Sequence, residues 1–570
     1  MSSSATPSFS PLAKPAPPGP DDREPLVQLP ESPAWSASPP RLLIIGAGSR
    51  GRAYARATRT SSNGIVCAVA EPDDYKRTEF VRTLLGNPGA AAEVLPAEGS
   101  VFKDWREFIV YEEARRARVL AGDKDVPPGV DAAFVCVLDE MHREVVLALT
   151  KLGGLHIMCE KPLATRLQDC VDLYEALRDN KSEKGEQLVF SIGHVMRYSP
   201  HNVLLRKLLL EDRVIGDILS VVHTEPVGFW HFTHSYVRGN WRREDKTAPS
   251  LLTKSCHDID VLMWLLCSPP SYSERDVEPP HLPSTVSSVG SLQYFKKSRK
   301  PVAAGGATNC LTCPMESSCK YSAKRIYVGK ELAGLGSGNT HWPVSIVLPD
   351  IESYGEDDKA KEALLSELAL DYDATVPDDQ VAKRNWFGRC VYEADNDVCD
   401  EQVVTITWDE DPLPSSRPTQ DAELAGLADP MKGRGSKTAT FHMVAQTSRI
   451  CDRYTNLYGV DGEVFADSTT VTVQDFRTGK TTTHRPRLES LGHGGGDAGL
   501  TRQFVLAVDK VKNHGWSTQK AQKELVGCTL DEVIRSHAMV FCAEEARKGK
   551  KVVDWPQWWA KEVERKLGPN

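Results

Sequence analysis

A glycine-rich turn at residues 46–51, GAGSRG, is the first group in the chain whose residue types and spacing suggest chemistry. It follows an apolar run and precedes a stretch typical of a helix, and Glu71 ends the next apolar run. In this pattern, backbone amides at the helix start bind a pyrophosphate and the later carboxylate binds a ribose. The sequence therefore predicts an NAD or NADP site that includes Gly46, Gly48, Ser49, Arg50, Gly51 and Glu71.

The three glycines have different tasks in such a turn. Gly46 permits the tight bend, Gly48 lets the pyrophosphate approach the backbone, and Gly51 lets helix and strand pack closely. Glu71 would repel the extra phosphate of NADP, which favours NAD, although Arg50 and Arg77 lie near enough in sequence to offset that repulsion. The alternative interpretation is a glycine turn that binds no ligand.

The segment from Glu225 to Arg242 concentrates aromatic and hydrogen-bonding side chains. Aromatic rings can cover the C–H face of a sugar while Arg, Asn and His bind its hydroxyl groups. An aromatic-rich packing strand and loop is an equally good interpretation. The substrate-binding candidates in this segment are Trp230, His234, Arg238 and Trp241.

Three cysteines, Cys310, Cys313 and Cys319, lie within ten residues. They could bind zinc, but a closed site normally needs a fourth ligand, which His341 or a more distant residue would have to supply. Reduced loop cysteines or a reversible disulfide are favoured over zinc. We therefore assign no metal.

The elements that must position these residues form an α/β pattern. Apolar runs alternate with helix-like stretches, which predicts a parallel sheet covered on both faces, the Rossmann arrangement. Beyond about residue 195, strands of period-two or mixed pattern predict an open, mainly antiparallel sheet. The predicted strands are residues 41–45, 65–70, 132–137, 155–159 and 187–192, then 217–225, 286–295, 402–408 and 438–446.

The chain of 570 residues is long enough for two domains. We predict a disordered tail rich in Pro, Ser and Ala, a Rossmann domain, a carboxyl-terminal α/β substrate domain that ends with an amphipathic helix, and a short final tail. Two polar segments of the second domain are predicted to be mobile surface insertions. The boundaries are residues 1–39, 40–193, 194–550 and 551–570, with insertions near 351–380 and 409–437 and the helix at 530–548.

Composition excludes several classes of function. The formal net charge of -9 and the lack of a long basic run argue against nucleic-acid binding. No apolar stretch is long enough to span a bilayer, and the first thirty residues do not resemble a secretion signal. The 14 cysteines are scattered, as in a reduced protein, so we expect a cytoplasmic location.

Residues 154–164, GLHIMCEKPLA, resemble the Gfo/Idh/MocA family, whose members carry Glu-Lys-Pro just after a Rossmann strand. The resemblance covers roughly residues 40 to 550. It implies a Rossmann domain, then an α/β domain with an open antiparallel sheet, and an active site between them. Further segments that look like one subgroup of the family are residues 193–200, 234–241, 254–260, 494–500 and 543–547.

The resemblance also implies roles for single residues. Lys161 would approach both substrate and cofactor, and His257 would be the acid/base. Relatives often have a histidine where His142 stands, upstream of the Glu-Lys-Pro strand. The same resemblance places Glu160 and His142 at the cofactor, and His194, Arg197 and Tyr198 at the substrate.

These residue types suit the oxidation of a secondary alcohol. A hydride goes to the nicotinamide while a base removes the hydroxyl proton, and histidine has a pKa near neutrality. The Lys161 ammonium would stabilise a developing alkoxide. Many relatives carry Asp four residues before the histidine, whereas this chain has Thr253 there, and Lys254 could take over part of the proton handling. The assignment among Lys161, Lys254 and His257 stays open.

The expected function is hydride transfer between NAD or NADP, with NAD favoured, and a sugar, polyol or related small hydroxylated metabolite. Two rivals remain. One is a sensor that binds dinucleotide and ligand without turnover, as the galactose-regulon repressor of yeasts does within this family. The other is an enzyme in which tightly held NAD oxidises a sugar transiently to allow glycosidic cleavage. A homo-oligomer is plausible because sheet surfaces in this family often pair.

Overall fold

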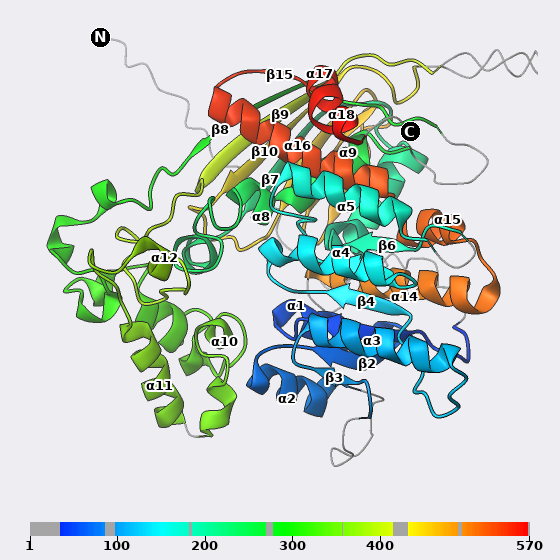
Figure 1. The fold of residues 1–570 in the computed structure, drawn as a ribbon. Coiled ribbons are helices and arrows are strands. Elements are labelled where there is room, and N and C mark those ends of the chain that lie inside the picture. The colour runs from blue at the N-terminus through cyan, green and yellow to red at the C-terminus, as the bar shows by residue number, and fades with distance from the viewer. Residues whose placement is uncertain are drawn as a thin grey trace, which may run out of the picture.

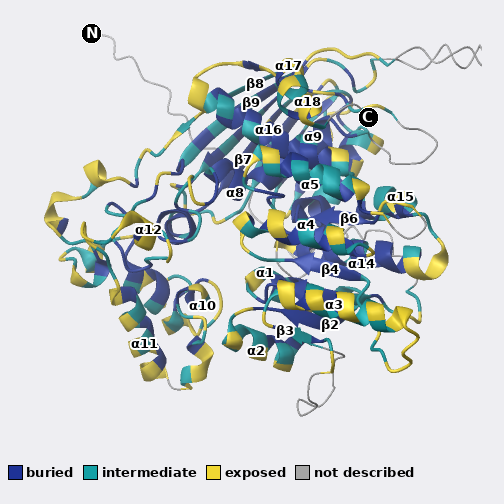
Figure 2. Ribbon diagram, viewed as in Figure 1, coloured by how far each residue is buried: buried dark blue, intermediate teal, exposed yellow. Residues whose placement is uncertain are grey.

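The computed structural model describes residues 35–85, 97–181, 185–269, 278–355, 357–413, 431–487 and 493–567. Two sheets organise these residues, a parallel one near the amino terminus and a larger mixed one (Figure 1). An additional lobe lies to one side of both sheets. Buried residues concentrate along the strands of the two sheets and on the helix faces that cover them (Figure 2).

The first sheet has six parallel strands in the order β3-β2-β1-β4-β5-β6, the strand order of a Rossmann fold. Leu42, Leu43 and Ile44 on the central strand are fully buried, which explains the continuous apolar runs. The strands are β1 Arg41–Ile45, β2 Ile65–Ala70, β3 Val101–Phe102, β4 Ala132–Val135, β5 His156–Cys159 and β6 Phe190–Ile192. The helices are α1 Ser49–Ser61, α2 Asp74–Leu84, α3 Trp105–Leu120, α4 His142–Leu152 and α5 Leu167–Asp179.

The second sheet has nine strands in the order β14-β13-β12-β11-β7-β10-β9-β8-β15. All neighbouring pairs are antiparallel except β7 and β10, so the mainly antiparallel sheet is confirmed. The strands are β7 Ile218–Pro226, β8 Thr285–Ser291, β9 Glu401–Trp408, β10 Lys437–Val444, β11 Tyr454–Gly459, β12 Gly462–Asp467, β13 Val471–Asp475, β14 Thr481–His484 and β15 Val553–Asp554.

Short helices lead from the first sheet into the second, and long helices cover the second sheet from one side. Helix α16 contacts both β8 and α5, so it joins the two halves of the molecule (Figure 1). It begins with a capping box between Thr529 and Glu532 and matches the amphipathic helix predicted there. The helices are α6 Pro200–Arg206, α7 Phe229–Phe232, α8 Ser250–Thr253, α9 Cys256–Leu266, α14 Gly496–His514, α15 Thr518–Ala521 and α16 Leu530–Gly549.

The lobe comprises residues 297–395, between β8 and β9, and has a small hydrophobic core of its own. Leu364 and Leu368 of α11 are fully buried in that core. Within the predicted insertion at residues 351–380, helical segments at 351–354, 357–369 and 378–381 pack in the lobe, while mobility of the insertion stays a prediction. The helices of the lobe are α10 Val344–Val347, α11 Asp357–Ala369 and α12 Asp378–Val381. Most of the other predicted insertion, 409–437, lies outside the described residues.

Helix α14, from near the end of the chain, packs against α1 of the Rossmann domain. Phe504 of α14 meets Phe134 of β4 edge to face, with ring centroids 5.3 Å apart. The Rossmann core is therefore completed by a carboxyl-terminal segment. A domain boundary placed only near residue 193 misses this return of the chain.

Residues 551–570 do not form a tail as predicted, at least as far as residue 567. Val553 pairs with Val286 and makes β15 the edge of the second sheet, and Trp555 of α17, Trp555–Trp559, is 1% exposed. Helix α18, Arg565–Leu567, ends the described chain. Burial of the large aromatic side chain of Trp555 stabilises the packing of this short segment.

Most of the predicted disordered tail, residues 1–39, lies outside the described residues, which begin at residue 35. The last residues of the predicted tail are bonded to α14: the Ser36 hydroxyl donates to Asp509, and Asn513 donates to the Ser38 carbonyl oxygen. Among the described residues, the structure has no helix of the length and apolarity that crossing a membrane requires. The cytoplasmic location stays a prediction.

Candidate functional site

The glycine turn joins β1 to α1 at the carboxyl edge of the parallel sheet. Gly46 has a φ of +94°, and an added Cβ there would lie 2.5 Å from the Cys136 carbonyl oxygen. A Cβ on Gly51 would lie 1.9 Å from the Gly46 carbonyl oxygen. A Cβ on Gly48 would meet nothing within 4 Å. The fold thus requires Gly46 and Gly51, whereas the space beside Gly48 is free for a ligand.

Among the described residues, helix α1 begins without a side-chain cap for its first amides. Its N-cap is Gly48, no side chain caps it, and its first turn, starting at Ser49, has no acidic residue. Unpaired amides and the positive end of the helix dipole favour an anion. The pyrophosphate of a nicotinamide dinucleotide fits this cradle.

Glu71 follows β2 and lies against the glycine turn. Its carboxylate accepts hydrogen bonds from the amides of Ala47 at 2.7 Å and Asp73 at 3.0 Å. Each oxygen retains acceptor capacity for a ribose hydroxyl. Arg77, which the sequence offered as a compensating cation, donates to the Glu71 carbonyl oxygen and pairs with Asp74.

Arg50 is ion-paired with two carboxylates. Its guanidinium pairs with Glu160 at 2.7 Å and with Asp497 of α14 at 2.8 Å. Tyr54 also donates to Glu160, and the Lys161 amide donates to the other carboxylate oxygen. Burial alone would raise the pKa of Glu160, but the Arg50 charge and the Tyr54 hydrogen bond hold that pKa below its usual value. Arg50 therefore fixes the Glu-Lys-Pro segment to the glycine loop.

Lys161 extends from the end of β5 toward the second domain. Its Nζ donates to the Thr253 carbonyl oxygen at 2.6 Å and lies 6.0 Å from the Trp241 ring centroid. Trp241 in turn donates to Asp139, which follows β4, at 2.8 Å. The structure therefore brings Lys161 and Trp241 together, with Thr253 contributing its backbone oxygen where relatives have a carboxylate.

Lys254 is buried beside Lys161's partner Thr253. Its Nζ lies 3.0 Å from a Glu225 carboxylate oxygen on β7 and 3.0 Å from the Cys451 sulfur. His231 Nδ1 lies 3.5 Å from the same sulfur. Burial would lower the pKa of Lys254, but Cys451 and Glu225 raise it above the usual value. Lys254 is therefore held as a cation.

His257, at the start of α9, is 4% exposed. Its Nε2 lies 3.0 Å from Arg453 Nη2 and 3.7 Å from a carboxylate oxygen of Asp258. A carboxylate does stand near this histidine, although the sequence position used by relatives holds Thr253. Burial lowers the pKa of His257 far below its usual value.

Four other predicted site residues lie in the scaffold below the site. His142 Nδ1 lies 2.7 Å from the Pro162 carbonyl oxygen, which supports the Glu-Lys-Pro turn from beneath. His194 is buried, and burial lowers its pKa to about 3. Arg197 makes two hydrogen bonds to Asp260, and Tyr198 donates to the Val526 carbonyl oxygen. Arg197 and Tyr198 are therefore both engaged in buried contacts of the scaffold.

The remaining predicted substrate residues contact the lobe. His234 Nδ1 lies 3.0 Å from the Tyr327 hydroxyl, and the buried Arg238 donates to the carbonyl oxygens of Arg389 and Tyr321. Trp230 lies 5.3 Å from the Trp342 ring. Trp342 also lies 4.9 Å from the ring of His231 and is 36% exposed. Trp342 is thus the partly exposed aromatic residue of this cluster.

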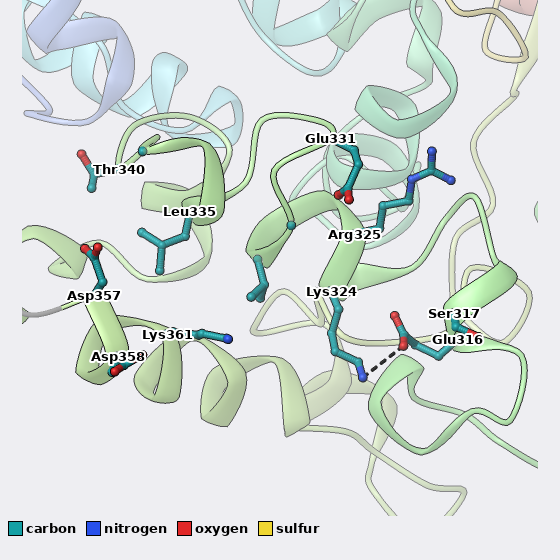
Figure 3. A pocket seen from close by; sticks show the side chains of 14 residues that line it. Glu316, Ser317, Lys324, Arg325, Glu331, Leu335, Thr340, Asp357, Asp358 and Lys361 are labelled. Carbon is teal, nitrogen blue, oxygen red and sulfur yellow. Dashed lines mark ion pairs between the residues drawn. The ribbon is translucent and has the colours of Figure 1, made fainter.

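The lobe also carries a groove of about 760 Å³ whose lining includes none of these candidates (Figure 3). Its side chains have mixed charge, with Lys324 paired to Glu316 at 3.0 Å. Cys310 lies outside this groove and accepts a hydrogen bond from Arg238. Within the described ranges, no three His, Cys, Asp or Glu residues are placed to share a metal ion. The cysteines are free thiols.

Sequence reasoning missed several residues that build the site. Arg453 and Glu225 complete the charged network, Asp497 holds Arg50, and Trp342 supplies an aromatic surface. Glu225 lies on β7 and Arg453 directly before β11, while Asp497 lies on α14 and Trp342 in the lobe. The available signals were weak: Arg453 follows Cys451 and Asp452 directly before a strand, and Asp497 follows three glycines.

Comparisons with known proteins agree with this architecture. Residues 41–184 match the model of an oxidoreductase family with an NAD-binding Rossmann fold, and residues 207–277 match the carboxyl-terminal α/β domain of the same family. The Rossmann match contains Gly48, Glu71 and Lys161. The second match contains His257.

Curated relatives align over part of their length. The chain is 31% identical over 137 residues to 2,7-anhydro-N-acetylneuraminate hydratase of Escherichia coli, covering 24% of this chain and 34% of that protein. It is 32% identical over 155 residues to 1,5-anhydro-D-fructose reductase of Ensifer adhaerens, covering 27% and 41%. It is 29% identical over 226 residues to inositol 2-dehydrogenase 2 of Saccharopolyspora erythraea, covering 39% and 52%. The chain thus spans about half or less of these relatives.

Solved structures share the fold over most of the chain. Levoglucosan dehydrogenase in complex with NADH and levoglucosan superposes with a TM-score of 0.52 at 15% identity, covering 91% of this chain and 100% of that one. An inositol dehydrogenase homolog from Azotobacter vinelandii in complex with NAD+ has a TM-score of 0.53 at 13% identity, covering 91% and 98%. With the strand order and the Glu-Lys-Pro segment beside the glycine loop, residues 41–184 and 207–277 match the two domains of the Gfo/Idh/MocA oxidoreductase family.

Proposed function

We propose that this chain is an oxidoreductase that transfers a hydride between NAD and a sugar, polyol or related small hydroxylated metabolite. The observation that carries the proposal is the uncapped start of α1 at Gly48, with Glu71 bonded to the same turn and the Glu-Lys-Pro segment joined to it through Arg50. The relatives named as an inositol dehydrogenase and an anhydrofructose reductase support the substrate class.

The cofactor preference follows from charge. Glu71 would repel the additional phosphate of NADP, and the two arginines that could offset it, Arg50 and Arg77, are paired with carboxylates. NAD is therefore favoured. A bound nicotinamide would supply the hydride acceptor or donor.

Within the chain, Lys161 is placed to hold the reacting hydroxyl group. Its Nζ has one described hydrogen bond, to Thr253, so its remaining hydrogen-bonding positions can contact a substrate oxygen. Trp241 lies beside it and would exclude water from one side. Lys254 and Arg453 add positive charge nearby, which stabilises a developing alkoxide.

Binding is tested by calorimetric titration of the Gly48→Val variant with NAD and NADP. The valine would fill the space that the pyrophosphate needs without touching the fold, so we expect loss of at least about tenfold in affinity. Gly306→Val is the matched control, because its added Cβ also meets nothing within 4 Å and it lies in the lobe. Equal affinity in all three proteins would contradict the proposed cofactor site.

Turnover separates the three candidate functions. Incubation with a panel of cyclic and open-chain sugars and polyols should give net NADH, followed by absorbance. Product release without net NADH would instead indicate redox-neutral glycosidic cleavage. Ligand-dependent NAD binding without either product would indicate a sensor. Lys161→Met should abolish net NADH formation, while Lys151→Met at the end of α4 serves as a control.

A further inference from the structure

Arg453 contacts the histidine that stands where relatives have an acid/base. Arg453 directly precedes β11, and its Nη2 lies 3.0 Å from Nε2 of His257. A guanidinium has only donors and stays protonated in proteins. His257 Nε2 must therefore accept this hydrogen bond, and the ring proton must reside on Nδ1.

Arg453 is held in that position by paired charges. Its Nε lies 2.5 Å from Asp258 and 2.7 Å from Glu225, both of which are fully buried. Each carboxylate has a further partner: His223 lies 3.1 Å from Asp258, and Lys254 lies 3.0 Å from Glu225. Moving Arg453 away would leave two buried carboxylates short of a cation, which is costly.

The surroundings of His257 also oppose a positive charge on its ring. The charged groups that face it are Asp258, which favours protonation, and Arg453, Lys161 and Lys254, which oppose it. Burial opposes it most, and the pKa of His257 lies well below the usual value. Nδ1 makes no hydrogen bond within the described residues. The ring is a poor proton acceptor at either nitrogen.

Of the three candidate residues, Lys161 is the best placed to exchange a proton with substrate. Lys254 is 8% exposed and bonded to Glu225 and Cys451, whereas Lys161 is half-buried and anchored by a single hydrogen bond. Lys161 also lies between the glycine loop and the second domain. Its Nζ therefore keeps room for a contact with a substrate hydroxyl group.

We propose that Arg453 donates a hydrogen bond that keeps His257 neutral. His257 accepts this bond and so helps to position Arg453, and Lys161 exchanges the proton with the substrate. This rests on the proposed oxidoreductase function. In the oxidation direction, the substrate O–H bond breaks and its proton joins an unprotonated Lys161 Nζ, while the hydride leaves the carbinol carbon for the nicotinamide dinucleotide and a carbonyl group forms. His257 is a positioning residue.

The protonation of His257 can be observed without turnover. The full chain is labelled with 15N-histidine, and His257 is assigned by the signals lost in His257→Gln, with the exposed His341→Gln as matched control. We expect a neutral ring protonated at Nδ1 that does not titrate between about pH 5 and 8. Titration of His257 within that range, or a proton on Nε2, would overturn the proposal.

Removal of Arg453 gives a second, independent readout. In Arg453→Gln the Asp258 carboxylate remains 3.7 Å from Nε2 and loses its guanidinium partner. The pKa of His257 should then rise, and its ring should begin to titrate in the same pH range. An unchanged, non-titrating ring in folded Arg453→Gln would show that Arg453 does not set the state of His257.

Kinetics then separate positioning from proton transfer. In His257→Gln the new side-chain amide oxygen can still accept from Arg453, whereas His257→Leu offers no acceptor. We expect kcat/KM to fall by at most about tenfold in the glutamine variant and by more in the leucine variant, whereas loss of a general base would cost about 10²- to 10⁴-fold. The acid limb of the pH profile of kcat/KM should be retained in both variants. Loss of that limb in His257→Gln would make His257 the proton carrier.

The two kinds of failure are distinguishable. If no substrate gives net NADH but the ring is neutral and does not titrate, the function is wrong and the Arg453 contact stands. If NADH forms and His257 titrates, the function stands and the role assigned to His257 is wrong.

Discussion

At the scale of single residues, the site depends on which charges are already paired. Arg50, Arg77 and Lys254 each have a carboxylate partner. Their influence on a ligand is therefore limited to the segments that they hold in place and to the electrostatic field of each ion pair. Within the described residues, the Glu71 carboxylate bonds to two backbone amides and has no cation partner. The cofactor preference therefore depends mainly on Glu71.

Replacing Glu71 tests this directly. Glu71→Ser removes the charge that repels the NADP phosphate, so the ratio of NADP to NAD affinity should rise by about tenfold or more. Calorimetric titrations with both dinucleotides measure the ratio. Glu463→Ser on β12, in the other domain, is the control. An unchanged ratio would show that another group selects the cofactor.

Local patterns were enough to place the glycine turn, Glu71 and the Glu-Lys-Pro segment at strand ends, and the structure brings these three close together. The predicted substrate residues, in contrast, are divided between several elements. The family resemblance places Arg197 at the substrate, whereas in the structure its side chain pairs with Asp260 of α9. Arg453 had no local signal, since its contacts arise only when β11 lies beside β7.

At the scale of elements, the lobe turns part of the predicted aromatic cluster inward and adds Trp342 to it. His234 stacks on Phe387 and Trp230 joins the core of the lobe, which leaves Trp342 partly exposed beside His231. The sequence showed the helices of residues 351–380 as an acidic segment because their exposed faces are charged. It did not show that their apolar residues share a core with residues near 230.

Trp342→Ala should weaken substrate binding more than turnover. Loss of an aromatic face next to a sugar removes about 1 kcal/mol, so we expect KM to rise about fivefold with kcat nearly retained. Steady-state kinetics with the best substrate of the panel measures both constants. Val302→Ala, at a 97% exposed position of the same lobe, is the control. An unchanged KM would place the substrate away from Trp342.

The carboxyl-terminal elements are expected to stabilise the second sheet. Trp555→Ala removes a side chain that is 1% exposed, and the cavity should lower the free energy of unfolding by about 3 kcal/mol. Urea unfolding followed by fluorescence measures the change. Gln557→Ala on the exposed side of the same helix is the control. Equal stability of the two variants would show that α17 is not part of the core.

At the scale of the whole molecule, buried neutral histidines link stability to pH. His156 and His537 each accept a backbone amide hydrogen bond on a ring nitrogen, and burial lowers the pKa of each from 6.5 to about 4. Below about pH 6.5 these two histidines bind protons in the unfolded chain but not in the native state. Stability present above that pH should therefore be lost as the pH falls toward 4.

The expected slope is about 1.4 kcal/mol per pH unit for each histidine, with other groups adding to it. Urea unfolding at intervals between about pH 7 and 5 measures it. His537→Asn should lower stability at pH 7 but flatten the slope. A stability that stays level or rises on acidification through this window would contradict the neutral state of both rings.

The return of α14 to the Rossmann domain has a consequence for how the protein is made. Domains generally fold as they leave the ribosome, amino-terminal part first. Here the dinucleotide loop carries Arg50, whose second carboxylate partner belongs to Asp497, and the sheet beneath is covered by Phe504. The earliest-synthesised domain must therefore wait for nearly the whole chain before its nucleotide site is complete, and a truncated translation product would lack a finished site.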